Sequence, residues 1–143
     1  VAIKVPVTME RIKTIKALKA EGAKVTATAV YSKAQAFMAL EAGADYIAPY
    51  YNRMEAMGID SAGVIADIAT IINTYGYKTK ILAASFKNVA QIDKAILAGA
   101  QCITSAPEIY ETALSGKVVA GAVDDFTRDW QAVYGDDRIC DLR

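Results

Sequence analysis

Short apolar runs alternate with longer amphipathic stretches along the chain. The runs are rich in Val, Ile and Ala, and the stretches repeat apolar residues three and four positions apart, as at Ile12, Ile15 and Leu18. Such runs predict strands buried in a parallel sheet, and the stretches predict helices that cover it. The predicted strands are 1–8, 24–30, 45–50, 80–86 and 101–105. The predicted helices run from the Thr8 cap to Gly22 and then span 34–41, 61–75, 89–97, 107–114 and 118–134, with a loop at 51–58.

Turn-forming residues mark the ends of these elements. Thr8, Ser32 and Asn88 precede predicted helices and are favoured N-caps. Glycines follow the helices where a left-handed residue would lead back into the sheet; they are Gly22, Gly43, Gly76 and Gly99. The repeated unit is therefore strand, helix, glycine, strand, and right-handed crossovers of this kind produce a parallel sheet.

The position of the glycines distinguishes two parallel architectures. A doubly wound nucleotide-binding fold needs a glycine-rich turn from strand to helix, whereas these glycines lie between helix and strand. We therefore predict an α/β fold of the parallel (β/α)8 type, the TIM barrel. A complete barrel takes roughly 200 residues or more, so 143 residues should form an incomplete barrel of about five βα units. We expect one partial barrel domain, 1–143, in which 118–143 form a C-terminal helix and tail.

The composition argues against several classes of function. Lys and Arg total 16, as do Asp and Glu, so we expect neither nucleic acid nor a membrane as a partner. No apolar run has the length of a membrane span, and we expect no secretory signal. Cys102 and Cys140 have no metal-ligand or disulfide spacing, which favours a reducing cytoplasm. The absence of histidine excludes Ser-His-Asp and Cys-His catalysis and argues against a zinc site, so any acid/base chemistry falls to Lys, Tyr, Asp or Glu. We also expect no cofactor.

The first predicted strand carries a lysine, Lys4, near its middle. A strand buried on both faces has no room for an unpaired ammonium, because burying one costs several kcal/mol. Lys4 therefore pairs, reaches water or becomes neutral, and a neutral lysine is a nucleophile. A lysine at a ragged chain start with its head in water is the simpler interpretation.

Polar residues at the ends of the other strands favour the nucleophile. The C-terminal ends of barrel strands form the active face. These ends carry Thr26, Thr28, Tyr50, Asn52, Arg53, Ser85, Lys87, Thr104 and Ser105, with small apolar residues between them. A lysine, a tyrosine, a threonine hydroxyl and a set of Ser, Arg and Lys suit Schiff-base chemistry on a phosphorylated carbonyl compound.

Each of these residues also has an ordinary structural interpretation. Thr26 and Thr28 are good strand formers, and Tyr50 could be a rim aromatic. The charges that follow the third and fourth strands could be solvated, and Ser85 could cap the next helix. The case rests on their shared location, not on any single residue.

Four segments resemble the small transaldolase family, and most closely its fructose-6-phosphate aldolase branch. The resemblance spans nearly the whole chain and is strongest at Ile3–Thr8, Gly22–Tyr31, Ile47–Arg53 and Leu82–Lys87. It implies a class I aldolase on a (β/α)8 barrel without a metal, with Lys4 as the Schiff-base residue. It also implies that Thr28 and Tyr50 hold the water that relays protons, and that Arg53 and Ser85 bind the substrate phosphate, with Lys87 nearby.

The branch of the family is indicated by one residue. Transaldolases proper carry phenylalanine where this sequence has Tyr50. The resemblance therefore implies cleavage or formation of fructose 6-phosphate from dihydroxyacetone and glyceraldehyde 3-phosphate, in carbohydrate metabolism linked to the pentose phosphates. The alternative is a transaldolase that transfers a dihydroxyacetone unit between sugar phosphates.

The front of the family pattern is missing from this sequence. Family members place an aspartate, a Thr-x-Asn and a glutamine or glutamate on three strands before the lysine strand, and this chain begins at Val1, directly before that strand. We expect the chain to be a fragment of the enzyme, and its activity without those strands is an open question. A non-catalytic, truncated barrel that only assembles with partners is the remaining alternative.

The last predicted helix has an apolar stripe. It consists of Val119, Val123, Phe126, Trp130 and Val133/Tyr134, and it lies opposite Asp124, Asp125, Arg128 and Asp129. The stripe could pack on its own barrel. The resemblance implies that this helix reaches a neighbouring subunit, so we predict a homo-oligomer.

Overall fold

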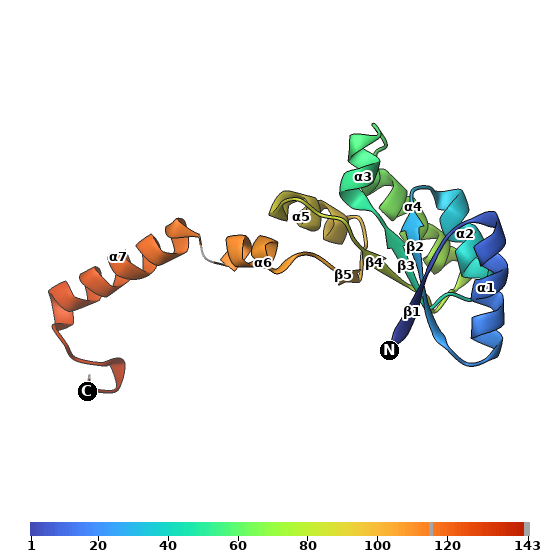
Figure 1. Ribbon diagram of the computed structural model, residues 1–143. Helices are drawn as coiled ribbons and strands as arrows, with labels where there is room; N and C mark the ends of the chain where they lie inside the picture. The colour runs from blue at the N-terminus through green and yellow to red at the C-terminus, as the bar shows by residue number, and fades with distance from the viewer. Residues whose placement is uncertain (115, 142–143) are drawn as a thin grey trace. The chain divides into compact units, whose positions relative to one another are not determined.

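Strands and helices alternate along the chain in the computed structural model, which describes residues 1–114 and 116–141 (Figure 1). The strands are β1 (Ala2–Pro6), β2 (Lys24–Val30), β3 (Tyr46–Pro49), β4 (Lys80–Ala83) and β5 (Cys102–Ile103). The helices are α1 (Met9–Ala20), α2 (Lys33–Glu41), α3 (Tyr51–Ala56), α4 (Ser61–Tyr75), α5 (Val89–Leu97), α6 (Pro107–Leu114) and α7 (Lys117–Tyr134), with a 3-10 turn at Ile139–Asp141. The chain forms two compact units, Val1–Ile109 and Tyr110–Arg143. The single partial domain stays a prediction.

The first unit is built on a parallel sheet. Its five strands are paired in chain order, β1-β2-β3-β4-β5, and each pair is parallel. Helices α1, α2, α4 and α5 follow one another beside the sheet (Figure 1). Strands alternating with helices in an open sheet of this order are consistent with a partial TIM barrel, so the predicted fold class is confirmed.

The predicted helix ends are also confirmed. The side chains of Thr8, Ser32 and Asn88 each accept a hydrogen bond from the backbone N–H three residues later, as N-caps do. Gly76 ends α4 with a left-handed φ of 69°. Gly99 has a φ of 104°, and a Cβ there would lie 2.9 Å from the Cβ of Ala69. Only glycine fits both the turn and this close approach.

Two predictions about local structure were wrong. Residues 51–56 form helix α3 rather than a loop, because Tyr51 and Met54 are buried and the Tyr51 N–H donates to the carbonyl of Ala84. Strand β1 is not buried on both faces: it lies at an edge of the described sheet, and Ala2 to Lys4 are exposed. An edge strand has a neighbour on one side only, so it leaves these side chains open to solvent.

Alternate strand residues face the helices and form the core. One row of paired residues runs across four strands through Val5, Ala27, Ile47 and Ile81, and all four are buried. Ile15, Ile65 and Ile68 of the helices belong to the same cluster of buried side chains. Side chains on a strand alternate between its two faces, so the intervening residues point to the other face of the sheet.

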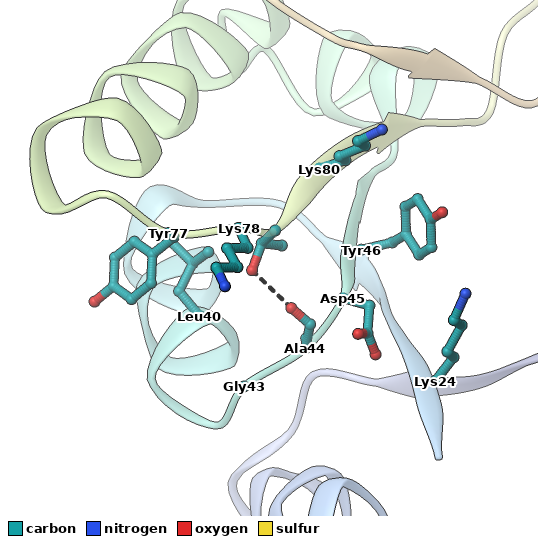
Figure 2. Close-up of a pocket in the computed structure, with 10 residues that line it drawn as sticks. Lys24, Leu40, Gly43, Ala44, Asp45, Tyr46, Tyr77, Lys78 and Lys80 are labelled. Carbon is teal, nitrogen blue, oxygen red and sulfur yellow. Dashed lines mark hydrogen bonds between the residues drawn. The ribbon is translucent and has the colours of Figure 1, made fainter. Parts of the chain in front are cut away.

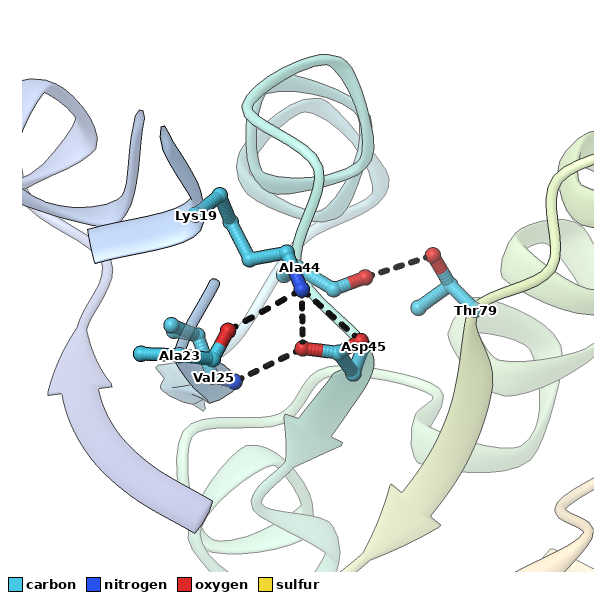
Figure 3. A network of polar contacts seen from close by, with 6 residues as sticks. All are labelled: Lys19, Ala23, Val25, Ala44, Asp45 and Thr79. Atoms are coloured by element: carbon cyan, nitrogen blue, oxygen red, sulfur yellow. Dashed lines mark hydrogen bonds and ion pairs between the residues drawn. The ribbon is translucent and has the colours of Figure 1, made fainter. Parts of the chain in front are cut away.

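An ion pair connects helix α1 to the N-terminal ends of β2 and β3. Lys19 of α1 donates to both carboxylate oxygens of Asp45, at 2.9 and 2.7 Å, and to the carbonyl of Ala23 (Figure 3). Asp45 also accepts a hydrogen bond from the Val25 N–H. Burial alone would raise the pKa of Asp45, but the hydrogen bonds from Lys19 and Val25 lower it below its ordinary value. These contacts join the last turn of α1 to the N-terminal ends of β2 and β3.

The other face of the sheet carries the polar residues. The neighbouring row runs through Lys4, Thr26, Tyr46 and Lys80. Strands tilt in a barrel, so such a row passes from one end of the barrel toward the other. Lys4 lines a cavity with the residues that follow β3 and β4, whereas Tyr46 and Lys80 line a second cavity at the strand N-terminal ends.

The second cavity has a volume of about 330 Å³ and contains three lysines. Figure 2 shows the ammonium groups of Lys24, Lys78 and Lys80 pointing in different directions. The hydroxyl of Thr79, also in its wall, is bound to the Ala44 carbonyl at 2.7 Å. The lysines therefore do not converge on a common anion site.

Candidate functional site

The first cavity lies at the C-terminal ends of the strands and has a volume of about 340 Å³. Four of the residues singled out in the sequence for catalysis or phosphate binding line it: Lys4, Tyr50, Arg53 and Ser85. Thr104 and Ser105, which follow β5, also contribute to its wall. The structure therefore brings together side chains that are separated by up to a hundred residues in the chain.

Thr28 does not line the cavity itself, but it is hydrogen-bonded to Tyr50, which does. The Thr28 hydroxyl lies 3.0 Å from the Tyr50 hydroxyl, and Thr28 is only 6% exposed. The residue after Thr28, Ala29, has a left-handed φ of 56°, and the pairing of β2 with β3 shifts between Ala27 and Val30. A bulge of this kind bends a strand and re-aims its side chains next to functional sites. Here the bulge interrupts the regular pairing of β2 with β3 next to the hydrogen bond between Thr28 and Tyr50.

Arg53 lies over Tyr50. The guanidinium carbon is 5.0 Å from the centre of the Tyr50 ring, a cation–π distance. The ring of Tyr31 meets that of Tyr50 edge-on at 5.9 Å. A hydrogen bond with the Tyr31 side chain, with a smaller contribution from Tyr50, raises the pKa of Arg53 above its ordinary value. Arg53 is therefore a permanent cation held at the cavity by two tyrosines.

Ser85, which also lines the cavity, has an unusual backbone. Its φ is 65°, in the left-handed region that serine rarely adopts. Its carbonyl accepts a hydrogen bond of 2.8 Å from the N–H of Asn52, in the first turn of α3. The helix that carries Arg53 thus holds the strained turn that carries Ser85.

The remaining candidates lie differently. Lys87 is exposed and does not line the cavity, and its backbone N–H donates to Gln91. Thr26 is buried on the sheet face that carries Lys4. Lys4 itself is exposed, so β1 does not remove its ammonium from water in the described chain. The predicted desolvation of this amine is therefore not seen here.

The comparisons with known proteins identify the family of the chain. Residues 1–136 match the model of a family described as transaldolase/fructose-6-phosphate aldolase. The chain belongs to this family. It is also 52% identical over 128 residues to a probable fructose-6-phosphate aldolase of Streptococcus pneumoniae (strain ATCC 700669 / Spain 23F-1). That alignment covers 90% of this chain and 58% of the relative, so the chain spans little more than half of that protein's length.

The position of the cavity agrees with membership of the transaldolase/fructose-6-phosphate aldolase family. Barrel enzymes carry their active sites at the C-terminal ends of the strands, where this cavity lies. Within the described residues there is no group of three or more Cys, Asp and Glu side chains that could hold a metal ion. In the same part of the chain, no helix combines the length and the apolar character that crossing a bilayer requires.

Two residues that contact the site were assigned no role from the sequence alone. Tyr31 contacts both Tyr50 and Arg53, and it directly follows β2, which is a signal that sequence reasoning could have used. Gln91 is 7% exposed and bonds to residues of α3. Its place three residues after the Asn88 cap indicates a capping role but not a contact with α3.

Proposed function

We propose that this chain carries the Schiff-base lysine and the phosphate ligands of a class I aldolase that interconverts fructose 6-phosphate with dihydroxyacetone and glyceraldehyde 3-phosphate. The observation that carries the proposal is the common cavity lined by Lys4, Tyr50, Arg53 and Ser85. An amine, a hydroxyl relay and a cation in one cavity are the groups that this reaction uses.

The amine of Lys4 would attack the ketone carbon of dihydroxyacetone and, after loss of water, form a protonated Schiff base. That cation draws electrons from the neighbouring carbon, so a proton leaves it and an enamine forms. The enamine carbon attacks the aldehyde of the acceptor, and the aldehyde oxygen takes up a proton. Water then hydrolyses the Schiff base, which releases fructose 6-phosphate and the free amine.

Proton transfer needs a group that can both donate and accept. The hydroxyls of Thr28 and Tyr50 are bound to each other at 3.0 Å, and Tyr50 lines the cavity, so a water held by this pair would lie at the cavity wall. We propose that this water moves the protons of the carbon–carbon bond-forming and hydrolysis steps. It would replace the histidine that many enzymes use and that this sequence lacks.

The acceptor phosphate would bind between Arg53 and Ser85. A guanidinium presents several N–H donors that match phosphate oxygens, and a serine hydroxyl adds another donor. Lys87 is exposed, follows Ser85 by two residues and would contribute positive charge at longer range. This arrangement supports a phosphorylated rather than a neutral acceptor.

A transaldolase reaction is the near alternative, and Tyr50 favours the aldolase. Release of free dihydroxyacetone requires that water reach and hydrolyse the Schiff base. The Tyr50 hydroxyl, bound to Thr28, supplies the polar site for that water. Comparing the release of dihydroxyacetone with its transfer to erythrose 4-phosphate separates the two reactions.

Borohydride trapping tests the central step. The protein expressed from its complete gene is incubated with dihydroxyacetone, reduced and mapped by peptide mass. We expect the adduct on Lys4, its loss in Lys4→Arg, and its retention in Lys80→Arg. Lys80 is the matched control because it is an exposed lysine in the same row across the sheet and lines the other cavity. A folded protein that yields no adduct, or one mapped elsewhere, would refute the proposal and leave a non-catalytic barrel segment.

We also propose that the protein works in the cytoplasm as a homo-oligomer. Cys102 and Cys140 are free thiols, which suits a reducing compartment. In α7, the apolar side chains Val119, Phe126 and Val133 are 59%, 73% and 71% exposed. Apolar surface of this kind favours association with a second copy. A molecular mass in light scattering equal to one chain, at all concentrations, would contradict the oligomer.

A further inference from the structure

The side chain of Gln91 joins the two segments that carry the proposed phosphate ligands. Its amide group donates to the Asn52 side chain at 3.1 Å and to the Glu55 carboxylate at 2.6 Å, and both partners belong to α3. Its oxygen accepts the Lys87 N–H at 2.8 Å. Gln91 is only 7% exposed, so these contacts lie in a nearly buried position.

These contacts close a ring of hydrogen bonds around the Ser85 turn. The Asn52 N–H binds the Ser85 carbonyl, the Asn52 side chain binds the Gln91 amide, and the Gln91 oxygen binds the Lys87 N–H. Arg53 is the next residue after Asn52. The position of Arg53 relative to Ser85 therefore depends on two contacts of this ring, the one between Asn52 and Ser85 and the one between Gln91 and Asn52.

A second glutamine shows what Gln91 would do without these cross-links. Gln35, one βα unit earlier, follows the Ser32 cap as Gln91 follows the Asn88 cap, and its oxygen accepts the Tyr31 N–H at 2.8 Å. Both glutamines thus close a form of the capping box at the start of a helix. The two glutamines differ in one respect. Among the contacts within the described residues, Gln91 also donates to a neighbouring helix, whereas Gln35 does not.

We propose that Gln91 is a positioning residue that fixes the distance between Arg53 and Ser85 and thereby sets the preference for a phosphorylated acceptor. This inference rests on the proposed function. Because the oxygen of Gln91 is held by the Lys87 N–H, its amide hydrogens must point toward α3. A donor at this place keeps the helix of Arg53 against the turn of Ser85, whereas an acceptor would repel the Glu55 carboxylate.

The test compares Gln91→Glu with Gln35→Glu. Each change keeps the oxygen that accepts the backbone N–H and adds the same charge, but only Gln91→Glu deletes the donor to Asn52 and Glu55. We expect Gln91→Glu to raise the KM for glyceraldehyde 3-phosphate about tenfold. The kinetics with unphosphorylated glyceraldehyde and the borohydride adduct on Lys4 should stay as in the unchanged protein. Gln35→Glu should change neither acceptor's KM more than about twofold.

A rescue variant separates positioning from simple loss of stability. In Gln91→Glu with Glu55→Gln, a new amide at 55 can donate to the new carboxylate at 91, so the KM for glyceraldehyde 3-phosphate should return to within about threefold of the original. Equal losses with both acceptors, or no rescue despite matched thermal melting, would overturn the proposal. If the unchanged protein itself shows no preference for the phosphorylated acceptor, the proposed function fails first, and the positioning role fails with it.

Discussion

Replacing Tyr50 by Phe removes one hydroxyl group and keeps the aromatic ring. The hydroxyl is bound to Thr28 at 3.0 Å, whereas the ring packs edge-on against Tyr31 and under Arg53. The change therefore leaves the packing in place and removes one member of the proposed water-holding pair. Thr28 is 6% exposed, so the loss of its partner should cost about 1 kcal/mol of unfolding free energy.

The effect on the reaction should be larger than the effect on stability. A positioned group that transfers protons typically contributes about 10²- to 10⁴-fold to the rate. Thr28 remains in the variant and can still bind water, so we expect the low end, about a 100-fold loss of kcat for fructose 6-phosphate cleavage, or about 2.7 kcal/mol of activation free energy. The KM should change little, because Arg53 and Ser85 are untouched.

Three measurements on the protein expressed from its complete gene check this reasoning. Steady-state cleavage gives kcat and KM, borohydride trapping reports whether Lys4 still forms its adduct, and erythrose 4-phosphate reports transfer. We expect trapping to persist and the balance to shift toward transfer. Tyr75→Phe is the matched control, because that tyrosine is 67% exposed and does not line the cavity. An unchanged kcat in Tyr50→Phe, or a loss of trapping with a folded protein, would refute the assigned role.

Three further outcomes follow from the structure. Tyr31→Phe keeps the ring but removes the hydroxyl whose interaction raises the pKa of Arg53. The KM for glyceraldehyde 3-phosphate should rise about threefold with no change for glyceraldehyde, and equal changes for both would contradict this. Ser85→Gly and Ser85→Ala both remove the proposed phosphate donor, but chemical denaturation should show the glycine variant to be about 1 kcal/mol more stable, because only glycine accepts the φ of 65° without strain. Asp45→Asn should destabilise the protein by about 1 kcal/mol at neutral pH. The folded-state pKa of Asp45 is lowered, so its contribution is present above the unfolded pKa of about 4 and is lost as the pH falls; a difference that persists at pH 2 in urea titrations would count against the Lys19 pair.

Local signals in the sequence were sufficient for most of the fold. Cap residues and glycines act on their own neighbours, so the predicted helices 61–75, 89–97 and 107–114 have the same bounds as α4, α5 and α6. The strand pattern also predicts the parallel order, because each strand returns to the sheet beside the previous one. The lengths of the strands were less predictable: β4 ends at Ala83, three residues earlier than expected, where the chain turns at Ser85.

Features that depend on contacts between residues far apart in the chain could not be predicted from such local signals. Helix α3 begins at Tyr51 because its first amides find carbonyl partners at Ala84 and Ser85, more than thirty residues away in the chain. A short helix whose first N–H groups bind another segment has no local capping signal to predict it. The same holds for Gln91, whose pattern indicates a cap while its contacts with α3 depend on the folded structure.

The two non-glycine residues with left-handed backbones among the described residues explain why the site was only partly predictable. Ala29 and Ser85 lie at the C-terminal ends of β2 and β4, beside Thr28 and in the cavity wall, respectively. Each such conformation costs about 1–2 kcal/mol, so neither residue type would choose it from local preference. The surrounding structure supplies the difference, through the hydrogen bond from Asn52 to Ser85 in one case and the shifted pairing with β3 in the other. Sequence patterns therefore place the strands along the chain, whereas the strained backbone at Ala29 and Ser85, which directs the side chains at the strand ends, depends on neighbouring strands and helices.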